Sequence, residues 1–154
     1  MARARRVPQP EAVMKPVSCL QHGPENRNDM GKVIHLSKSE FCRRISDVER
    51  HPDSWNYLGD RPAVVDFFAQ WCGPCRALSP VLDKLAGEYG DRIHIYKVDV
   101  DAEPELASIF GVRSVPTLLF APSDGKPQIA RGLLSADKLH DLIDNMLAAA
   151  PAGH

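Results

Sequence analysis

The sequence predicts an α/β fold with a mixed central β-sheet of about five strands, flanked by about four helices. Strand-like and helix-like segments alternate through most of the chain, which is typical of parallel strands joined by helices. Near the C-terminal end, two strand-like segments follow each other across the turn signal Asp124-Gly125, which predicts an antiparallel edge. In addition, residues 63–69 are almost entirely apolar, as expected for a strand covered on both faces.

The first elements are a short strand and a capped helix. A strand is expected at 33–36. Ser37 and Glu40 have the spacing of a capping box, so a helix should begin here. Apolar residues at helical spacing mark its buried face: Phe41, Ile45 and Val48. The apolar strand at 63–69 then follows a polar connection.

A long helix is expected from Cys72 towards Tyr89, directly after the apolar strand. Its buried stripe consists of Leu78, Leu82, Leu85 and Tyr89. Pro80 lies inside this helix and should kink it, because proline lacks the amide hydrogen and its ring clashes with the preceding turn.

The last elements complete the sheet and cover it. The remaining strands are expected at 94–100, 115–120 and 128–131. A short helix at 104–110 should end at Gly111, and Pro116 lies near the start of the second of these strands. Ser135 should cap the final helix. The apolar face of that helix is Leu139, Leu142, Ile143, Met146 and Leu147.

These elements define one predicted domain at residues 32–150. Residues 1–31 contain prolines, arginines and polar residues without sustained periodicity. Such a composition buries too little apolar surface to offset the entropy lost on ordering, so we expect a disordered tail. Residues 151–154 are expected to be a flexible C-terminus.

Composition and charge limit the classes of partner. Hydrophobic residues make up 44% of the chain and charged residues 25%, as in ordinary globular proteins, and the formal net charge is −1. This charge gives no electrostatic argument for nucleic acid, and no apolar run approaches the roughly 20 residues that span a bilayer. We expect a cytoplasmic monomer that binds neither nucleic acid nor membrane. A periplasmic or organellar location is the alternative if the Arg-rich N-terminal segment is a targeting signal.

The chain has four cysteines, of which only Cys72 and Cys75 have a functional spacing. A secreted disulfide scaffold would usually carry more, so the count favours a reducing compartment. Two alternatives to a redox pair remain. The pair could be half of a zinc site completed by Cys19 and His22, or a structural disulfide, although so short a loop constrains the unfolded chain little. Cys42, beside the apolar face of the first helix, is expected to be a partly buried structural thiol.

The position of Cys72 predicts a reactive thiol. It follows a buried strand and opens a helix, where unpaired backbone amides and the positive end of the helix dipole favour a thiolate. A thiolate is the nucleophile in disulfide exchange. Cys75 lies on the same side of the helix, so it can resolve a mixed disulfide formed by Cys72. Pro74 suits the first helical turn, and Gly73 adds no side chain that would shield the sulfur.

The motif Trp71-Cys72-Gly73-Pro74-Cys75 is identical to the active-site motif of the thioredoxin family. Further segments resemble that family in the same order and at similar spacing: Val65-Asp66-Phe67, Pro80, Lys97-Val98-Asp99, residues 111–117 and Gly132. The resemblance implies the thioredoxin fold and a general protein-disulfide reductase that contributes to cell redox homeostasis. Such a reductase would work by thiol–disulfide exchange through Cys72–Cys75, without a metal or bound cofactor. The implied partners are disulfide-containing proteins and a thioredoxin reductase or equivalent electron donor.

The resemblance also implies roles for two charged residues. Asp66 would be a buried carboxylate beneath Cys75, with a raised pKa that suits it to accept the proton of that thiol. Lys97 would modulate this carboxylate. From the residues alone, both side chains could instead face solvent.

A substrate-docking surface follows from the same resemblance. Its implied members are Trp71, Gly73, Pro74, Val115, Pro116 and Gly132. Pro116 would be cis and would expose the backbone of Val115 for pairing with an extended substrate segment. From the residues alone, Trp71 could also be an exposed loop aromatic that packs on the helix.

The chain departs from the family at Phe68, where thioredoxins usually carry a second tryptophan. A longer segment at 50–60 and an altered hairpin at 121–125 leave the choice of partners open, but not the chemistry. Two other functions also remain open: an exported thioredoxin-like reductase or isomerase, and a non-catalytic binding subunit with this fold. Gly73-Pro74 between the cysteines is similar to the reducing members of the family, whereas oxidising ones usually have a histidine there.

Overall fold

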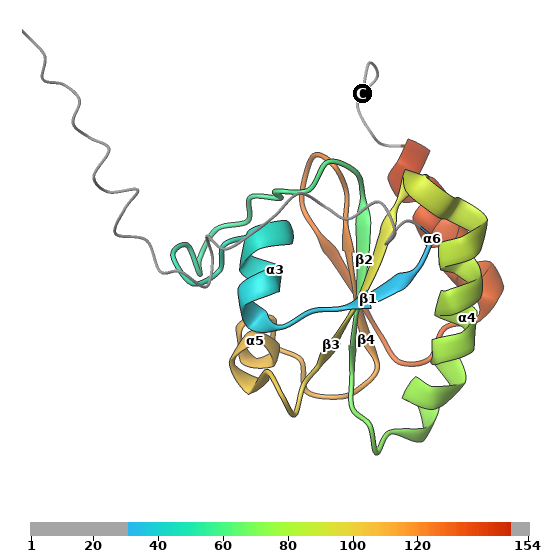
Figure 1. Ribbon diagram of the computed structural model, residues 1–154, viewed down its shortest axis with the longest axis horizontal. Coiled ribbons are helices and arrows are strands. Elements are labelled where there is room, and N and C mark those ends of the chain that lie inside the picture. The colour runs from blue at the N-terminus through green and yellow to red at the C-terminus, as the bar shows by residue number, and fades with distance from the viewer. Residues whose placement is uncertain (1–30, 149–154) are drawn as a thin grey trace, which may run out of the picture.

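The computed structural model describes residues 31–148 and contains a mixed five-stranded sheet with helices on both faces (Figure 1). The strand order is β1-β3-β2-β4-β5. The strands are β1 (Val33–His35), β2 (Ala63–Phe68), β3 (His94–Asp99), β4 (Thr117–Ala121) and β5 (Gln128–Arg131). The first three are parallel, and β4 runs antiparallel to both of its neighbours, β2 and β5. The predicted class, with its parallel part and antiparallel edge, is confirmed.

Two helices cover each face of the sheet (Figure 1). One face carries α3 (Lys38–Arg44) and α5 (Pro104–Ile109), and the other carries α4 (Gly73–Tyr89) and α6 (Ala136–Ala148). A short 3-10 helix, η2 (Gly90–Arg92), follows α4. Separate apolar clusters fill the two interfaces between helices and sheet. All six residues of β2 are buried, as predicted for a central strand covered on both sides.

The predicted capping box begins α3. The Ser37 hydroxyl accepts a hydrogen bond from the Glu40 amide at 3.2 Å, and the Ser37 amide donates to the Glu40 carboxylate at 3.0 Å. The helix is shorter than its apolar pattern suggests, because Ile45 is already the C-cap residue. Ile45 and Val48 are nevertheless buried in the same cluster as Phe41, so the apolar pattern identified the core correctly and overestimated the helix length.

Replacing Ser37 with alanine should lower the free energy of unfolding by about 1 kcal/mol, because the helix loses the side-chain acceptor for its first free amides. Urea denaturation of the oxidised protein measures this loss. Ser54→Ala is a matched control, since Ser54 is exposed and lies in a loop. Equal unfolding midpoints for Ser37→Ala and Ser54→Ala would show that the capping box does not stabilise the domain.

The bounds of the remaining helices and strands either match the sequence prediction or differ from it for a local reason. α4 continues across Pro80 without interruption, and the expected kink there stays a prediction. β4 begins at Thr117 rather than Val115, because Pro116 has no amide hydrogen to donate to the ladder. Ser135 accepts a hydrogen bond from the Lys138 amide at 3.1 Å, as a helix cap should.

The terminal segments 1–30 and 149–154 lie outside the described residues. The expectations of a tail and a flexible C-terminus therefore stay predictions, as does any role for Cys19 and His22. In the part of the chain that the structure describes, no helix is long and apolar enough to cross a membrane.

Candidate active site

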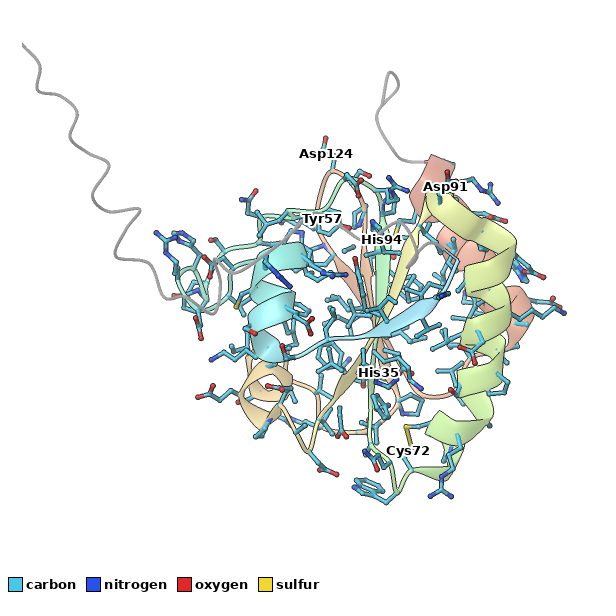
Figure 2. The ribbon with its side chains drawn as sticks, viewed as in Figure 1. His35, Tyr57, Cys72, Asp91, His94 and Asp124 are labelled. Atoms are coloured by element: carbon cyan, nitrogen blue, oxygen red, sulfur yellow. A yellow bond between two sulfur atoms is a disulfide. The ribbon has the colours of Figure 1, made fainter. Side chains whose placement is uncertain are left out.

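The two closely spaced cysteines lie at the start of α4, directly after β2, and form a disulfide (Figure 2). Cys72 is the N-cap residue, and its sulfur accepts a hydrogen bond from the Cys75 amide at 3.2 Å. This bond and the positive end of the helix dipole both favour negative charge on that sulfur once the disulfide is reduced. The residues are nearly buried, with 4% exposure for Cys72 and 2% for Cys75.

The loop before β4 places Val115, one of the predicted docking residues, against the disulfide. The Val115–Pro116 peptide is cis, as the resemblance implied, and the Val115 carbonyl oxygen lies 3.6 Å from the sulfur of Cys72. The Pro116 carbonyl oxygen accepts a hydrogen bond from the Gly132 amide at 2.8 Å. Gly132 has a φ of 90°, a conformation that favours glycine over residues with a side chain.

Trp71 is exposed beside this loop. Its side chain has 68% exposure, and its indole N–H donates to the Asp101 carboxylate at 2.8 Å. Asp101 was not predicted as a site residue, because it lies 30 positions away and contacts Trp71 only in the folded chain. A small cavity of about 110 Å³ lies between Trp71 and the loop. Its lining consists of Trp71, Val100, Val112, Arg113, Ser114 and Val115.

Asp66 is fully buried in β2, so the alternative of a solvent-facing carboxylate is wrong. Burial raises its pKa to about 7, and the positive charge of Lys97 opposes this shift without cancelling it. Neither carboxylate oxygen has a hydrogen-bond partner among the described residues. Asp66 therefore changes its charge close to neutral pH.

Lys97 is also buried, with 8% exposure, which overturns the solvent-facing alternative for this residue as well. Its ammonium group donates to the Ser79 hydroxyl at 3.0 Å and lies 4.5 Å from the centre of the Phe68 ring. Phe68 packs in one cluster with the residues of the disulfide, where it takes the place of the second tryptophan usual in thioredoxins. Ser79 was missed in the sequence, although it lies four residues after Cys75 and so on the buried side of α4.

Cys42 and the metal alternative can be examined only within the described residues. Cys42 is a free thiol with 1% exposure, so it is more completely buried than the predicted partly buried thiol. Within residues 31–148 there is no group of three or more His, Cys, Asp or Glu side chains that could hold a metal ion.

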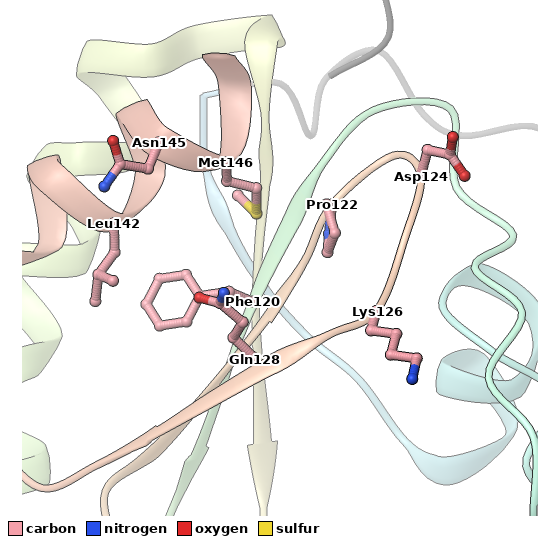
Figure 3. Close-up of a pocket in the computed structure, with 8 residues that line it drawn as sticks. All are labelled: Phe120, Pro122, Asp124, Lys126, Gln128, Leu142, Asn145 and Met146. Atoms are coloured by element: carbon pink, nitrogen blue, oxygen red, sulfur yellow. The ribbon is translucent and has the colours of Figure 1, made fainter. Parts of the chain in front are cut away.

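A second, larger cavity lies away from the cysteines. It has a volume of about 300 Å³ and is enclosed by the β4–β5 hairpin and α6 (Figure 3). Its lining consists of Phe120, Pro122, Asp124, Lys126, Gln128, Leu142, Asn145 and Met146. Asp124 lies at the opposite end of the molecule from Cys72 (Figure 2). None of the predicted site residues lines this cavity.

Comparison with known proteins agrees with this geometry. The family model described as Thioredoxin matches residues 32–145. A thioredoxin from Borreliella burgdorferi is 44% identical over 111 residues, covering 72% of this chain and 94% of that protein. Thioredoxin 1 from Nostoc sp. is 39% identical over 118 residues, covering 77% of this chain and 100% of that protein.

Solved structures give the same result for the fold. A mutant thioredoxin from Halobacterium salinarum superposes with a TM-score of 0.63 at 32% identity, covering 80% of this chain and 97% of the other. The predicted thioredoxin fold is thus confirmed. Taken with the cysteine pair at the start of α4, these matches show that the chain belongs to the thioredoxin family of protein-disulfide oxidoreductases, which serve redox homeostasis through an active-site cysteine pair.

Proposed function

We propose that this chain is a general protein-disulfide reductase in which Cys72 attacks, Cys75 resolves and Asp66 accepts a proton. The observation that carries the proposal is the position of Cys72 at the N-cap of α4, where its sulfur accepts the Cys75 amide. A thiolate at this position is stabilised near neutral pH, and it is the species that attacks disulfides.

The reaction consists of two exchanges. The Cys72 thiolate attacks one sulfur of a substrate disulfide, so a mixed disulfide forms and the other substrate sulfur leaves as a thiolate. Cys75 then transfers its thiol proton to Asp66 and attacks the Cys72 sulfur. The Cys72–Cys75 disulfide forms, and the second substrate sulfur leaves as a thiolate that takes up a proton. The substrate gains two electrons, and the chain loses two.

Asp66 suits the proton-accepting role because its pKa of about 7 lies near the working pH of such a reaction. A carboxylate of ordinary pKa would be a much weaker base for a thiol. Phe68, two residues along the same strand and on the same face, belongs to the buried cluster that contains both cysteines. This shared face supports the proposed position of Asp66 beneath the cysteine pair. Lys97 modulates this carboxylate through its charge.

The substrate would bind as an extended segment beside the disulfide. The Val115 carbonyl oxygen, next to the Cys72 sulfur, offers the acceptor for backbone pairing. Exposed Trp71 borders the same surface, as does Gly132, whose amide is hydrogen-bonded to Pro116. Gly73 and Pro74, at the start of α4, are also exposed. The cavity beside this loop has a volume of only about 110 Å³, which suits a protein substrate better than an enclosed small molecule.

Membership of the family implies disulfide-containing substrate proteins and a reductase as partners. We propose that a thioredoxin reductase or an equivalent dithiol donor reduces the Cys72–Cys75 disulfide back to the dithiol after each turnover. A reducing compartment such as the cytoplasm would suit this chemistry, since thiols are kept reduced there.

The reduction potential of Cys72–Cys75 tests the proposed direction of the reaction. Equilibration with defined thiol–disulfide buffers should give a value near the reducing end of the range for these oxidoreductases, together with catalytic reduction of insulin. Because about 30 mV corresponds to a tenfold change in the equilibrium constant, reductases and oxidases separate clearly. A potential near the oxidising end would overturn the proposal and indicate disulfide formation or isomerisation.

A further inference from the structure

A row of polar side chains crosses the three parallel strands beneath α4. His35 of β1 pairs in register with Lys97 of β3, and Lys97 pairs with Asp66 of β2. Residues paired directly across neighbouring strands present their side chains on the same face of the sheet. The hydrogen bond from Lys97 to Ser79 shows that this is the face covered by α4. The row therefore places a charged pair of strand residues within an otherwise apolar interface.

Within this row, the Lys97 ammonium is bound to the helix and not to the neighbouring carboxylate. It donates to the Ser79 hydroxyl at 3.0 Å and lies over the Phe68 ring at 4.5 Å. Both oxygens of Asp66 lack a hydrogen-bond partner among the described residues, although Asp66 and Lys97 are register partners. A hydroxyl from α4 thus competes successfully with a carboxylate for a buried ammonium group.

We propose that Ser79 is a positioning residue whose hydroxyl holds the Lys97 ammonium against α4 and prevents it from closing an ion pair with Asp66. This inference rests on the proposed role of Asp66 as proton acceptor. A closed ion pair would stabilise the ionised carboxylate and lower its pKa by about 1–3 units. The carboxylate would then be a weaker base for the Cys75 thiol.

Among residues 31–148, Lys97 is the charged group that acts on the pKa of Asp66. The other residues around Asp66 and Lys97 on this face of the sheet are His35 from β1, Asp99 from β3 and the uncharged Leu118 from β4. Cys75 is a buried residue of α4, the helix that covers this face. Asp99 is engaged by the Gln70 amide and the Asp101 backbone amide, at 3.2 and 2.9 Å. His35 lies edge-on to Phe68, with ring centres 5.6 Å apart. Lys97 is the charged group that shifts the pKa of Asp66.

The test is a titration of the Asp66 carboxyl carbon by NMR in the full, oxidised chain. The unmodified protein should titrate near pH 7. Ser79→Ala should lower the midpoint by about one pH unit, because the freed ammonium turns to the carboxylate. Ser79→Thr keeps the hydroxyl and should restore the original midpoint. Ser108→Ala is the matched control, since Ser108 is an exposed serine on α5. An unchanged or raised midpoint in Ser79→Ala would overturn the inference.

A double-mutant cycle with Lys97→Met separates positioning from a merely structural effect. Without the ammonium group, Ser79→Ala should no longer move the Asp66 midpoint. A shift that persists in the Lys97→Met background would contradict the inference. The pH profile of disulfide reduction tests the proton-acceptor role separately. If the midpoint moves in Ser79→Ala and the activity profile does not follow, Ser79 positions Lys97 as inferred, and Asp66 is not the proton acceptor.

Discussion

Replacing Cys72 with serine is expected to lower the rate of disulfide reduction by at least about three orders of magnitude. A serine hydroxyl stays protonated near neutral pH, so the helix terminus that stabilises a thiolate has no anion to stabilise. The mixed disulfide with substrate cannot form, and Cys75, which lies deeper, has 2% exposure. Insulin reduction with a dithiol as electron donor measures the rate.

A matched variant distinguishes attack from resolution. Cys75→Ser should still attack substrate and should accumulate a covalent mixed disulfide, which mass spectrometry of the intact protein detects. Cys42→Ala, which removes the buried free thiol on α3, should retain activity. If Cys72→Ser kept its turnover, Cys72 could not be the nucleophile. If the serine variants of both positions kept the biological activity, the chain would be a binding subunit and not a reductase.

Replacing Asp66 with asparagine is expected to stabilise the protein strongly at alkaline pH. The carboxyl has a pKa of about 7 in the folded chain and an ordinary value of 3.8. The folded state therefore holds this proton more tightly than the unfolded state, and stability falls as pH rises from about 4 to about 7. The difference between these two pKa values corresponds to about 4 kcal/mol of unfolding free energy, and this contribution is lost above pH 7. An uncharged asparagine removes this loss.

Urea denaturation of the oxidised protein at pH 4 and pH 8 measures the effect. Asp66→Asn should gain about 4 kcal/mol relative to the unmodified protein between these two pH values, whatever its effect at pH 4 alone. Asp83→Asn, at an exposed position on α4, serves as the control and should show no such gain. Parallel pH dependence of Asp66→Asn and the unmodified protein would mean that the burial of this carboxylate does not govern stability.

Elements set by local signals were predictable from the sequence. The capping box at Ser37 and Glu40 specifies the start of α3, and the turn at Asp124-Gly125 leads to β5 at the expected residues. The apolar run of β2 predicted a central strand buried on both faces. These features depend on neighbours in the chain, so the sequence contains all the information that they require.

Features that depend on contacts between distant elements were harder to predict from the sequence. In a strand buried on both faces, alternation of polar and apolar residues disappears, so the sequence could not decide whether Asp66 faces solvent. The contact of Lys97 with Ser79 joins a strand to a helix, and the contact of Trp71 with Asp101 joins two loops.

The central position of β2 also affects how the protein opens. Its amides are hydrogen-bonded to β3 on one side and β4 on the other, and none of its residues is exposed. Amide groups of such a strand exchange with solvent only when the whole domain unfolds, whereas edge strands and helix ends open locally. The cysteine pair follows β2 directly, so it is attached to the part of the fold with the slowest exchange. Partial opening at the edges of the sheet therefore leaves the redox pair in place. The pair loses its geometry only when the whole domain unfolds.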